Sequence, residues 1–153
     1  MRSASLIAIV LAASFLFAQA NLKAATEGGM KFDGNWSVTV DHKLYENPDG
    51  SKALPFVWHF PATVKNGVFH GEIGTRGKPG WYELNGQIEA SGTATFRADE
   101  ISGSQKYNFT VSKKAPPDRG YPYSYQVVAR FDSRRGTGHA TDWRTRIFTF
   151  VKE

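Results

Sequence analysis

The side chains that most often carry out chemistry are scattered along this sequence. Its four histidines are His42, His59, His70 and His139, and no two stand at a spacing that places both on one strand face. A metal site would therefore need residues from several strands. Scattered histidines are usually not ligands, so we expect no metal and no cofactor. His139 and Asp142 are close enough in the chain to pair, which predicts a surface hydrogen bond.

The sequence offers no recognisable catalytic group. A hydrolase needs a nucleophile beside a base, or paired carboxylates in a cleft. Serines are numerous, but no Gly-x-Ser-x-Gly motif is present. Four acidic residues fall near the ends of expected strands, where solvated carboxylates are common: Glu83, Glu89, Asp99 and Glu100. We therefore expect a protein that is not an enzyme and has no catalytic residues.

The N-terminal segment has the pattern of an export signal. Arg2 precedes an apolar stretch over residues 6–17, and Ala18-Gln19-Ala20 forms a small-x-small cleavage site. The apolar stretch is shorter than the roughly 20 residues that span a membrane. We expect a signal peptide over 1–20, a flexible leader over 21–31 and one domain over 32–153. The mature chain would then be periplasmic or secreted, without a membrane span.

Positive charge and aromatic residues gather toward the C-terminus. Residues 113–153 carry nine basic and four acidic side chains, whereas residues 21–112 carry nine and ten. A basic, aromatic-rich face can bind an anionic polymer, although positive charge on strand edges also prevents edge-to-edge pairing. An exported protein has little reason to meet nucleic acid, so we expect a cell-envelope glycan instead. The candidate ligand-binding residues are Trp81, Tyr121, Tyr123, Arg134, Arg135, Trp143, Arg144 and Arg146.

Three of these candidates are aromatic residues close to expected turns. Trp81 follows a glycine-rich turn, and Tyr121 and Tyr123 flank Pro122. We expect these side chains to be exposed. Most other aromatic residues alternate with polar ones, which places them in a core.

The sequence predicts that the candidate residues are carried by β-strands and the turns between them. Composition indicates one globular domain: 153 residues, 41% hydrophobic, with no cysteine that could form a disulfide. Apolar residues then alternate with polar ones at period two. Asn66-Gly67 between apolar residues predicts a tight hairpin, and residues 133–138 read as another turn. The expected strands cover residues 36–41, 56–64, 68–73, 82–88, 93–99, 107–111, 123–131 and 143–152.

Eight sequential strands with short connections favour one architecture. Neighbouring strands pair antiparallel, and eight of them can close into an up-and-down barrel without exposed edges. The all-β prediction is therefore a single antiparallel eight-stranded barrel, with a two-sheet β-sandwich as the alternative. Such a barrel can be filled by side chains or can hold one small ligand. The number of large aromatic residues argues for a mostly filled interior.

Two resemblances accompany this pattern. Gly34-Asn35-Trp36 resembles the opening of calycin barrels, the lipocalins and avidin-like proteins. That resemblance implies that a basic side chain of the last strand, Arg144 or Arg146, packs across Trp36. The structural residues would then be Gly34 and Trp36.

The second resemblance is to small secreted proteins of root-nodule bacteria of the nodule formation efficiency type. It rests on four segments: residues 32–36, 77–81, 135–138 and 146–152. It implies a contribution to host association and offers no catalytic residues. We expect a monomeric exported binding protein for a glycan, a small ligand or an envelope protein. The alternatives are a protein-binding or inhibitor module of the cell envelope and a calycin-like carrier of a small ligand.

Overall fold

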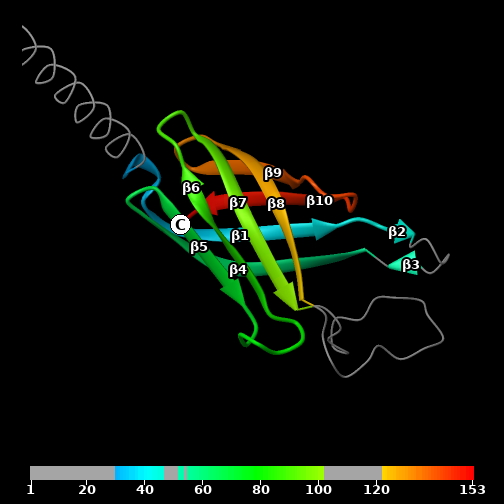
Figure 1. Cartoon of the computed structure of the whole chain (residues 1–153). Coiled ribbons are helices and arrows are strands. Elements are labelled where there is room, and N and C mark those ends of the chain that lie inside the picture. Colours follow the sequence, from blue (N-terminus) through cyan, green and yellow to red (C-terminus); the bar gives the residue numbers. More distant parts are fainter. Residues whose placement is uncertain (1–29, 47–51, 54, 102–121) are drawn as a thin grey trace, which may run out of the picture.

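The strands form a closed barrel (Figure 1). The computed structural model describes residues 30–46, 52–53, 55–101 and 122–153. Within these ranges it contains a short 3-10 helix, ten strands and no α-helix. The elements are η1 (Met30–Phe32), β1 (Gly34–His42), β2 (Tyr45–Glu46), β3 (Lys52–Ala53), β4 (Phe56–Lys65), β5 (Val68–Ile73), β6 (Tyr82–Ile88), β7 (Thr93–Ile101), β8 (Pro122–Phe131), β9 (Arg135–Ala140) and β10 (Arg146–Lys152).

Eight of the strands make the barrel wall. Their order is β1-β10-β9-β8-β7-β6-β5-β4, and β4 pairs with β1 to close the ring. Every pairing is antiparallel between neighbours in the order, so the topology is up-and-down. The remaining strands, β2 and β3, form a two-stranded ladder beyond the ends of β1 and β4. The predicted barrel is confirmed, and the sandwich alternative is wrong.

One predicted turn is a strand. Residues 133–138 read as a turn, yet Arg135–Ala140 forms β9 and pairs with both β8 and β10. The predicted strand over 107–111 lies outside the described residues. The barrel has the expected eight strands, but one of them, β9, is not among the strands that the sequence pattern predicted.

The glycines of β9 are required by packing. Gly136 and Gly138 occupy inward positions that alternate with exposed ones. A Cβ atom on Gly136 would lie 2.7 Å from the Phe131 ring, and one on Gly138 would lie 2.8 Å from the Cβ of Ala129. Both distances are shorter than van der Waals contact, so these positions exclude a larger residue.

One end of the barrel is filled with aromatic rings; we call it the packed end. Trp36 is fully buried, and its ring meets that of Phe131 edge to face at 5.3 Å. Its Nε1 donates to the carbonyl oxygen of Phe32 at 2.8 Å, which fixes η1 over the barrel. Farther along the interior, Phe69 and Phe96 lie 4.8 Å apart. This part of the interior is filled, as the aromatic content predicted.

The expected partner of Trp36 is wrong. The register of β1 and β10 places Lys152 opposite Trp36 and Arg146 opposite His42. Arg146 therefore lies at the other end of the barrel. Arg144 precedes β10 and is farther still from Trp36 along the same direction. At the packed end it is Lys152 that reaches η1, where its Nζ donates to the carbonyl oxygen of Lys31 at 3.3 Å.

The hairpin between β4 and β5 has the predicted turn. Asn66 and Gly67 both have positive φ, 54° and 75°, which a type I′ turn needs. No described helix is long and apolar enough to cross a membrane.

Candidate functional site

The barrel end opposite the packed end is lined by polar side chains; we call it the polar end. Strands β1, β5, β7 and β9 finish there, and β4, β6, β8 and β10 begin there. It lies on the side of β2 and β3 in Figure 1. Its residues continue the inward alternation of their strands, except for Asp142 in the connection from β9 to β10. They are His42, Phe56, Trp58, Tyr82, Glu100, Tyr123, Tyr125, Asp142 and Arg146.

Arg146 is the centre of charge at the polar end. The residue is 2% exposed. Its Nη1 donates to Asp142 Oδ2 at 2.7 Å, and its Nη2 lies 3.9 Å from Glu100 Oε1. The guanidinium carbon also lies 4.1 Å from the ring centre of Tyr125. Two carboxylates and an aromatic face thus compensate a buried cation.

Asp142 has a second donor. The hydroxyl of Tyr123 donates to the same Oδ2 at 2.8 Å. The predicted pairing of Asp142 with His139 is therefore wrong, because Oδ2 of Asp142 accepts from Tyr123 and Arg146 and Oδ1 has no partner among the described residues. Nearby, the hydroxyl of Tyr125 donates to that of Tyr82 at 3.3 Å.

His42 is a neutral ring in an aromatic stack. Its ring lies 4.0 Å from that of Phe56 in nearly parallel planes and 4.9 Å from that of Trp58. Burial, assisted by the positive charges of Arg146 and Arg144, lowers the pKa of His42 to about 3. The imidazole is therefore uncharged at neutral pH. Burial raises the pKa of Glu100, and Arg146 opposes that rise.

Among the described residues, no hydrogen-bond partner is present for His42 Nε2, Asp142 Oδ1 or Arg146 Nε, which are buried polar atoms of the polar end. Buried polar atoms are nearly always satisfied, because leaving one unpaired costs about 1–3 kcal/mol. These three atoms belong to side chains from β1, the β9–β10 connection and β10. They give the polar end an acceptor, a donor and an imidazole nitrogen that can be either. These are the hydrogen-bonding groups that a polar ligand would use.

Some of the predicted site residues meet at the polar end. Tyr123 and Arg146 line it. Trp143 and Arg144 lie in the connection before β10, where the Arg144 guanidinium carbon is 4.6 Å from the Trp143 ring and 5.2 Å from the Tyr123 ring. Trp143 is 55% exposed. Four of the eight predicted residues are therefore neighbours.

The other predicted residues do not join them. Arg134 and Arg135 lie at the turn from β8 to β9, at the packed end, so the basic residues do not form one face. Trp81 lies on the outside of the wall and is buried, contrary to the expected exposure; its Nε1 donates to Glu72 Oε1 at 2.5 Å. Tyr121 lies outside the described residues. Gly34 has a φ of 137°, a conformation that favours glycine.

His42, Glu100 and Asp142 were not among the predicted site residues. His42 continues the inward series of Trp36, Val38 and Val40, and Glu100 follows inward Ala98. A polar residue such as histidine or glutamate at an inward position can be recognised from the sequence, and this pattern could have identified both as candidate site residues. Asp142 could not be found in this way, because it lies outside any strand.

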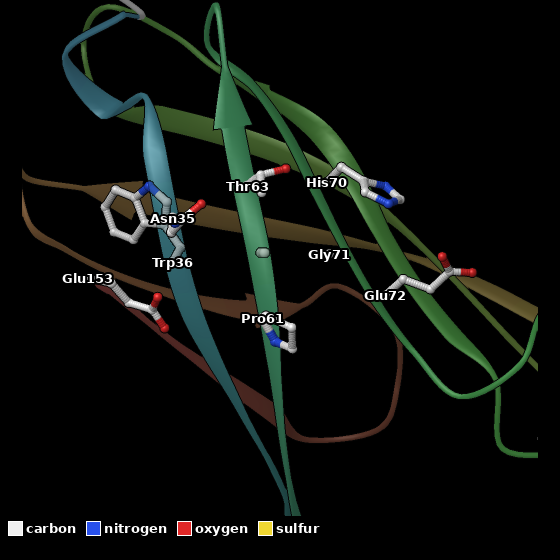
Figure 2. Close-up of a pocket in the computed structure, with 9 residues that line it drawn as sticks. Asn35, Trp36, Pro61, Thr63, His70, Gly71, Glu72 and Glu153 are labelled. Atoms are coloured by element: carbon white, nitrogen blue, oxygen red, sulfur yellow. The ribbon is translucent and has the colours of Figure 1, made fainter.

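The outer surface carries a groove that is open to solvent (Figure 2). It has a volume of about 370 Å³ and lies over β1, β4 and β5. Its polar lining comes from Asn35, Thr63, His70, Glu72 and Glu153. No described side chain there has an unpartnered buried polar atom, so the polar end is the stronger candidate for a ligand site.

No family model matches this chain, and comparisons with curated proteins and with solved structures find no significant match. What the structure establishes is a small eight-stranded antiparallel barrel, a fold compatible with binding. The resemblances to calycins and to the nodule formation efficiency proteins stay predictions beyond that fold.

Proposed function

We propose that this chain is an exported, non-enzymatic binding protein that holds a small neutral polyhydroxylated ligand, a saccharide, at the polar end of its barrel. The observation that carries the proposal is the group of unpartnered buried atoms on His42, Asp142 and Arg146 beside aromatic rings. Small-molecule sites commonly combine a few placed polar groups with an apolar lining.

The charges of the polar end favour a neutral ligand. Arg144 and Arg146 are matched by Glu100 and Asp142, so the formal charge of the four sums to zero. An anionic glycan, which the basic C-terminal segment suggested, would meet the two carboxylates. A neutral ligand avoids that repulsion.

The hydrogen-bonding groups favour hydroxyls. Asp142 Oδ1 only accepts and Arg146 Nε only donates, whereas a sugar hydroxyl does both. The rings of Phe56 and Trp58 beside His42 supply flat apolar faces. A pyranose presents both hydroxyls and an apolar face, so it matches both kinds of group.

Export belongs to the same proposal. It is supported by the basic, apolar and small-x-small pattern of residues 1–20. We expect the secreted or periplasmic protein to begin at Asn21, which mass spectrometry of the protein recovered outside the cytoplasm would test. A role in host association is supported by the resemblance to the root-nodule proteins. A deletion strain that competes normally on its host would remove that support.

Binding is tested with the untagged protein and a panel of neutral mono- and oligosaccharides. An array identifies the preferred sugar, and titration calorimetry measures its Kd. The decisive variant is His42→Phe, because it keeps the ring stack and removes the imidazole nitrogens. We expect it to weaken binding at least about tenfold. The control is His139→Phe, the same change on an exposed position of β9.

Two results would contradict the proposal. One is a panel in which no neutral saccharide binds; the other is a His42→Phe variant that binds the preferred sugar as tightly as the wild type. Cleavage of the bound sugar on long incubation would overturn the non-enzymatic part alone. Chromatography of the incubated mixture detects it.

A further inference from the structure

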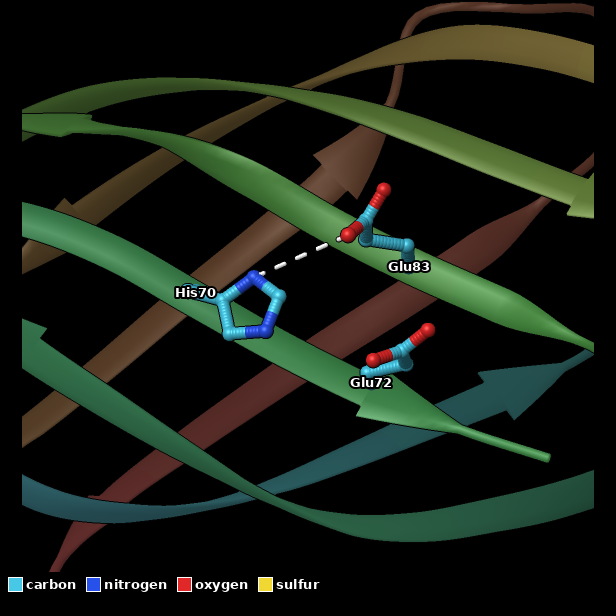
Figure 3. A group of neighbouring side chains, drawn as sticks. All are labelled: His70, Glu72 and Glu83. Atoms are coloured by element: carbon cyan, nitrogen blue, oxygen red, sulfur yellow. Dashed lines mark ion pairs between the residues drawn. The ribbon is translucent and has the colours of Figure 1, made fainter. Parts of the chain in front are cut away.

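A histidine and two glutamates meet on the outer wall of the barrel, away from the polar end (Figure 3). His70 and Glu72 point outward from β5, and Glu83 lies directly opposite Glu72 on β6. One ligand atom from each side chain lies within 4.8 Å of the other two. The nitrogen-bearing edge of the imidazole faces both carboxylates in Figure 3. The register of β5 and β6 thus brings His70 close to Glu83, which is 13 positions later in the sequence.

We propose that His70, Glu72 and Glu83 form a binding site for a divalent transition-metal ion, with Zn²⁺ the best match. This site is separate from the proposed saccharide site, and neither proposal depends on the other. The sequence suggested no metal, since the spacing of the histidines alone does not show which glutamates a strand register brings beside them.

The imidazole of His70 is oriented for a metal. Its Nδ1 lies 2.7 Å from Asn85 Oδ1. An amide oxygen only accepts, so Nδ1 carries the proton and Nε2 keeps its lone pair. Metal-binding histidines usually donate their other N–H to such an oxygen, which fixes the tautomer and the ring. Nδ1 also lies 3.8 Å from Glu83 Oε1, the contact drawn as a dashed line in Figure 3, so Nε2 is the atom with which His70 would ligate a metal.

The two carboxylates each keep an oxygen for a metal. Among the described residues, Trp81 Nε1 donates to Glu72 Oε1, and Arg76 pairs with the Oε1 atoms of Glu72 and Glu83. These contacts use only the Oε1 atoms, so the Oε2 atom of each glutamate is available to a metal. Trp81 and Arg76 come from the connection between β5 and β6, which folds back on the wall and holds the carboxylates in place.

The pair of carboxylates favours a divalent cation. Like charges directly opposite one another on neighbouring strands destabilise a sheet. Glu83 is only 7% exposed, so water screens its charge poorly. Arg76 supplies one positive charge against two negative ones, and its side chain is 62% exposed. A divalent ion would neutralise both carboxylates, and the exposed Arg76 can move aside for it.

The donor set selects the metal. One imidazole nitrogen and two carboxylate oxygens suit Zn²⁺, which accepts both atom types and often takes three protein ligands and a water. Mg²⁺ and Ca²⁺ prefer oxygen ligands alone. The adjoining outer groove, lined by His70 and Glu72, gives an ion access from solvent.

The test is titration calorimetry of the untagged, metal-free full chain with ZnCl₂, because a histidine tag would itself bind zinc. We expect one zinc ion per chain. His70→Ala and Glu83→Gln should each weaken binding at least about tenfold. His139→Ala, on an exposed position without this carboxylate pair, should leave the affinity unchanged.

Arg76→Gln separates a metal site from a plain ion pair. If Arg76 competes with zinc for the carboxylates, its removal should tighten zinc binding severalfold. If the cluster is only an ion pair, the variant should lose stability and gain no affinity for zinc. Absence of saturable one-to-one binding, or equal affinity of His70→Ala and wild type, would overturn the proposal.

Discussion

Arg146 and Asp142 form a buried ion pair that joins β10 to the connection before it. Nη1 of Arg146 lies 2.7 Å from Oδ2 of Asp142, and the two side chains are 1% and 9% exposed. Neither charge is well solvated, so each depends on the other. The pair also receives the hydroxyl of Tyr123. The same contact therefore holds the polar end together and places the proposed ligand-binding atoms.

Removal of the Asp142 charge should destabilise the barrel strongly. Asp142→Asn keeps the shape of the side chain, but of the described residues it leaves the Arg146 guanidinium only Glu100 as a counter-charge, at 3.9 Å. Breaking a buried pair costs about 3–5 kcal/mol. Urea denaturation should show a loss of free energy of unfolding near the lower end of that range.

A matched control for this prediction lies on the outer wall. Asp99 pairs with Arg97 at 2.9 Å, and the Arg97 side chain is 69% exposed. Exposed pairs contribute about 0–1 kcal/mol, so Asp99→Asn should cost little. Similar losses in the two variants would show that burial of the Arg146 pair does not matter.

Stability should fall in acid because of His42. Its pKa is about 3 in the folded protein and 6.5 when the side chain is free. Between these values the unfolded chain binds the proton and the folded chain does not. The free energy of unfolding should therefore decrease as the pH falls from about 6.5 to about 3.

The His42→Phe variant isolates this contribution. Glu100 acts in the opposite direction, because its raised pKa makes the folded state hold a proton that the unfolded state releases. Glu100 is present in both proteins, so its contribution largely cancels when they are compared. Urea titrations across this pH range should show wild type losing stability relative to the variant as the pH falls. Parallel curves would refute the buried neutral imidazole.

The barrel could be predicted because alternating apolar and polar residues identify the inward face of most of its strands. Trp36, Val38 and Val40 alternate with polar residues, and the same pattern recurs in most other strands. β9 was not predicted as a strand, because glycine usually indicates a turn. In β9 the inward Gly136 and Gly138 leave room for rings and backbone of β8.

The missed strand also explains the error about the basic face. With a turn at 133–138, Arg134, Arg135, Arg144 and Arg146 would lie close together. The chain instead runs the length of β9 between them, so the two pairs of arginines lie toward opposite ends of the barrel. Neither the polar end nor the His70 cluster could be derived from spacing, because each depends on the register of strands that are distant in sequence.

An inward methyl group on β9 should not be tolerated. In Gly138→Ala the new Cβ would lie 2.8 Å from the carbonyl oxygen of Val128 and 2.8 Å from the Cβ of Ala129. Overpacking of this kind costs about 1–3 kcal/mol. Thr137→Ala, on the exposed side of the same strand, should change stability by less than about 0.5 kcal/mol. Thermal or urea unfolding distinguishes the two, and equal effects would contradict the inward placement of Gly138.

Asp33 should anchor the β4–β5 turn to the start of β1. Its Oδ2 and Oδ1 accept hydrogen bonds from the backbone N–H groups of Asn66 and Gly67, at 2.8 and 3.0 Å. Asp33→Ala removes both acceptors, each a charged partner, so we expect a loss of about 1–3 kcal/mol. Hydrogen exchange at the amides of Asn66 and Gly67 should accelerate more than at the centre of β4. Asp41→Ala, which removes only an exposed ion pair with Lys43, is the control. Unchanged exchange at the two turn amides in Asp33→Ala would show that Asp33 does not hold the turn.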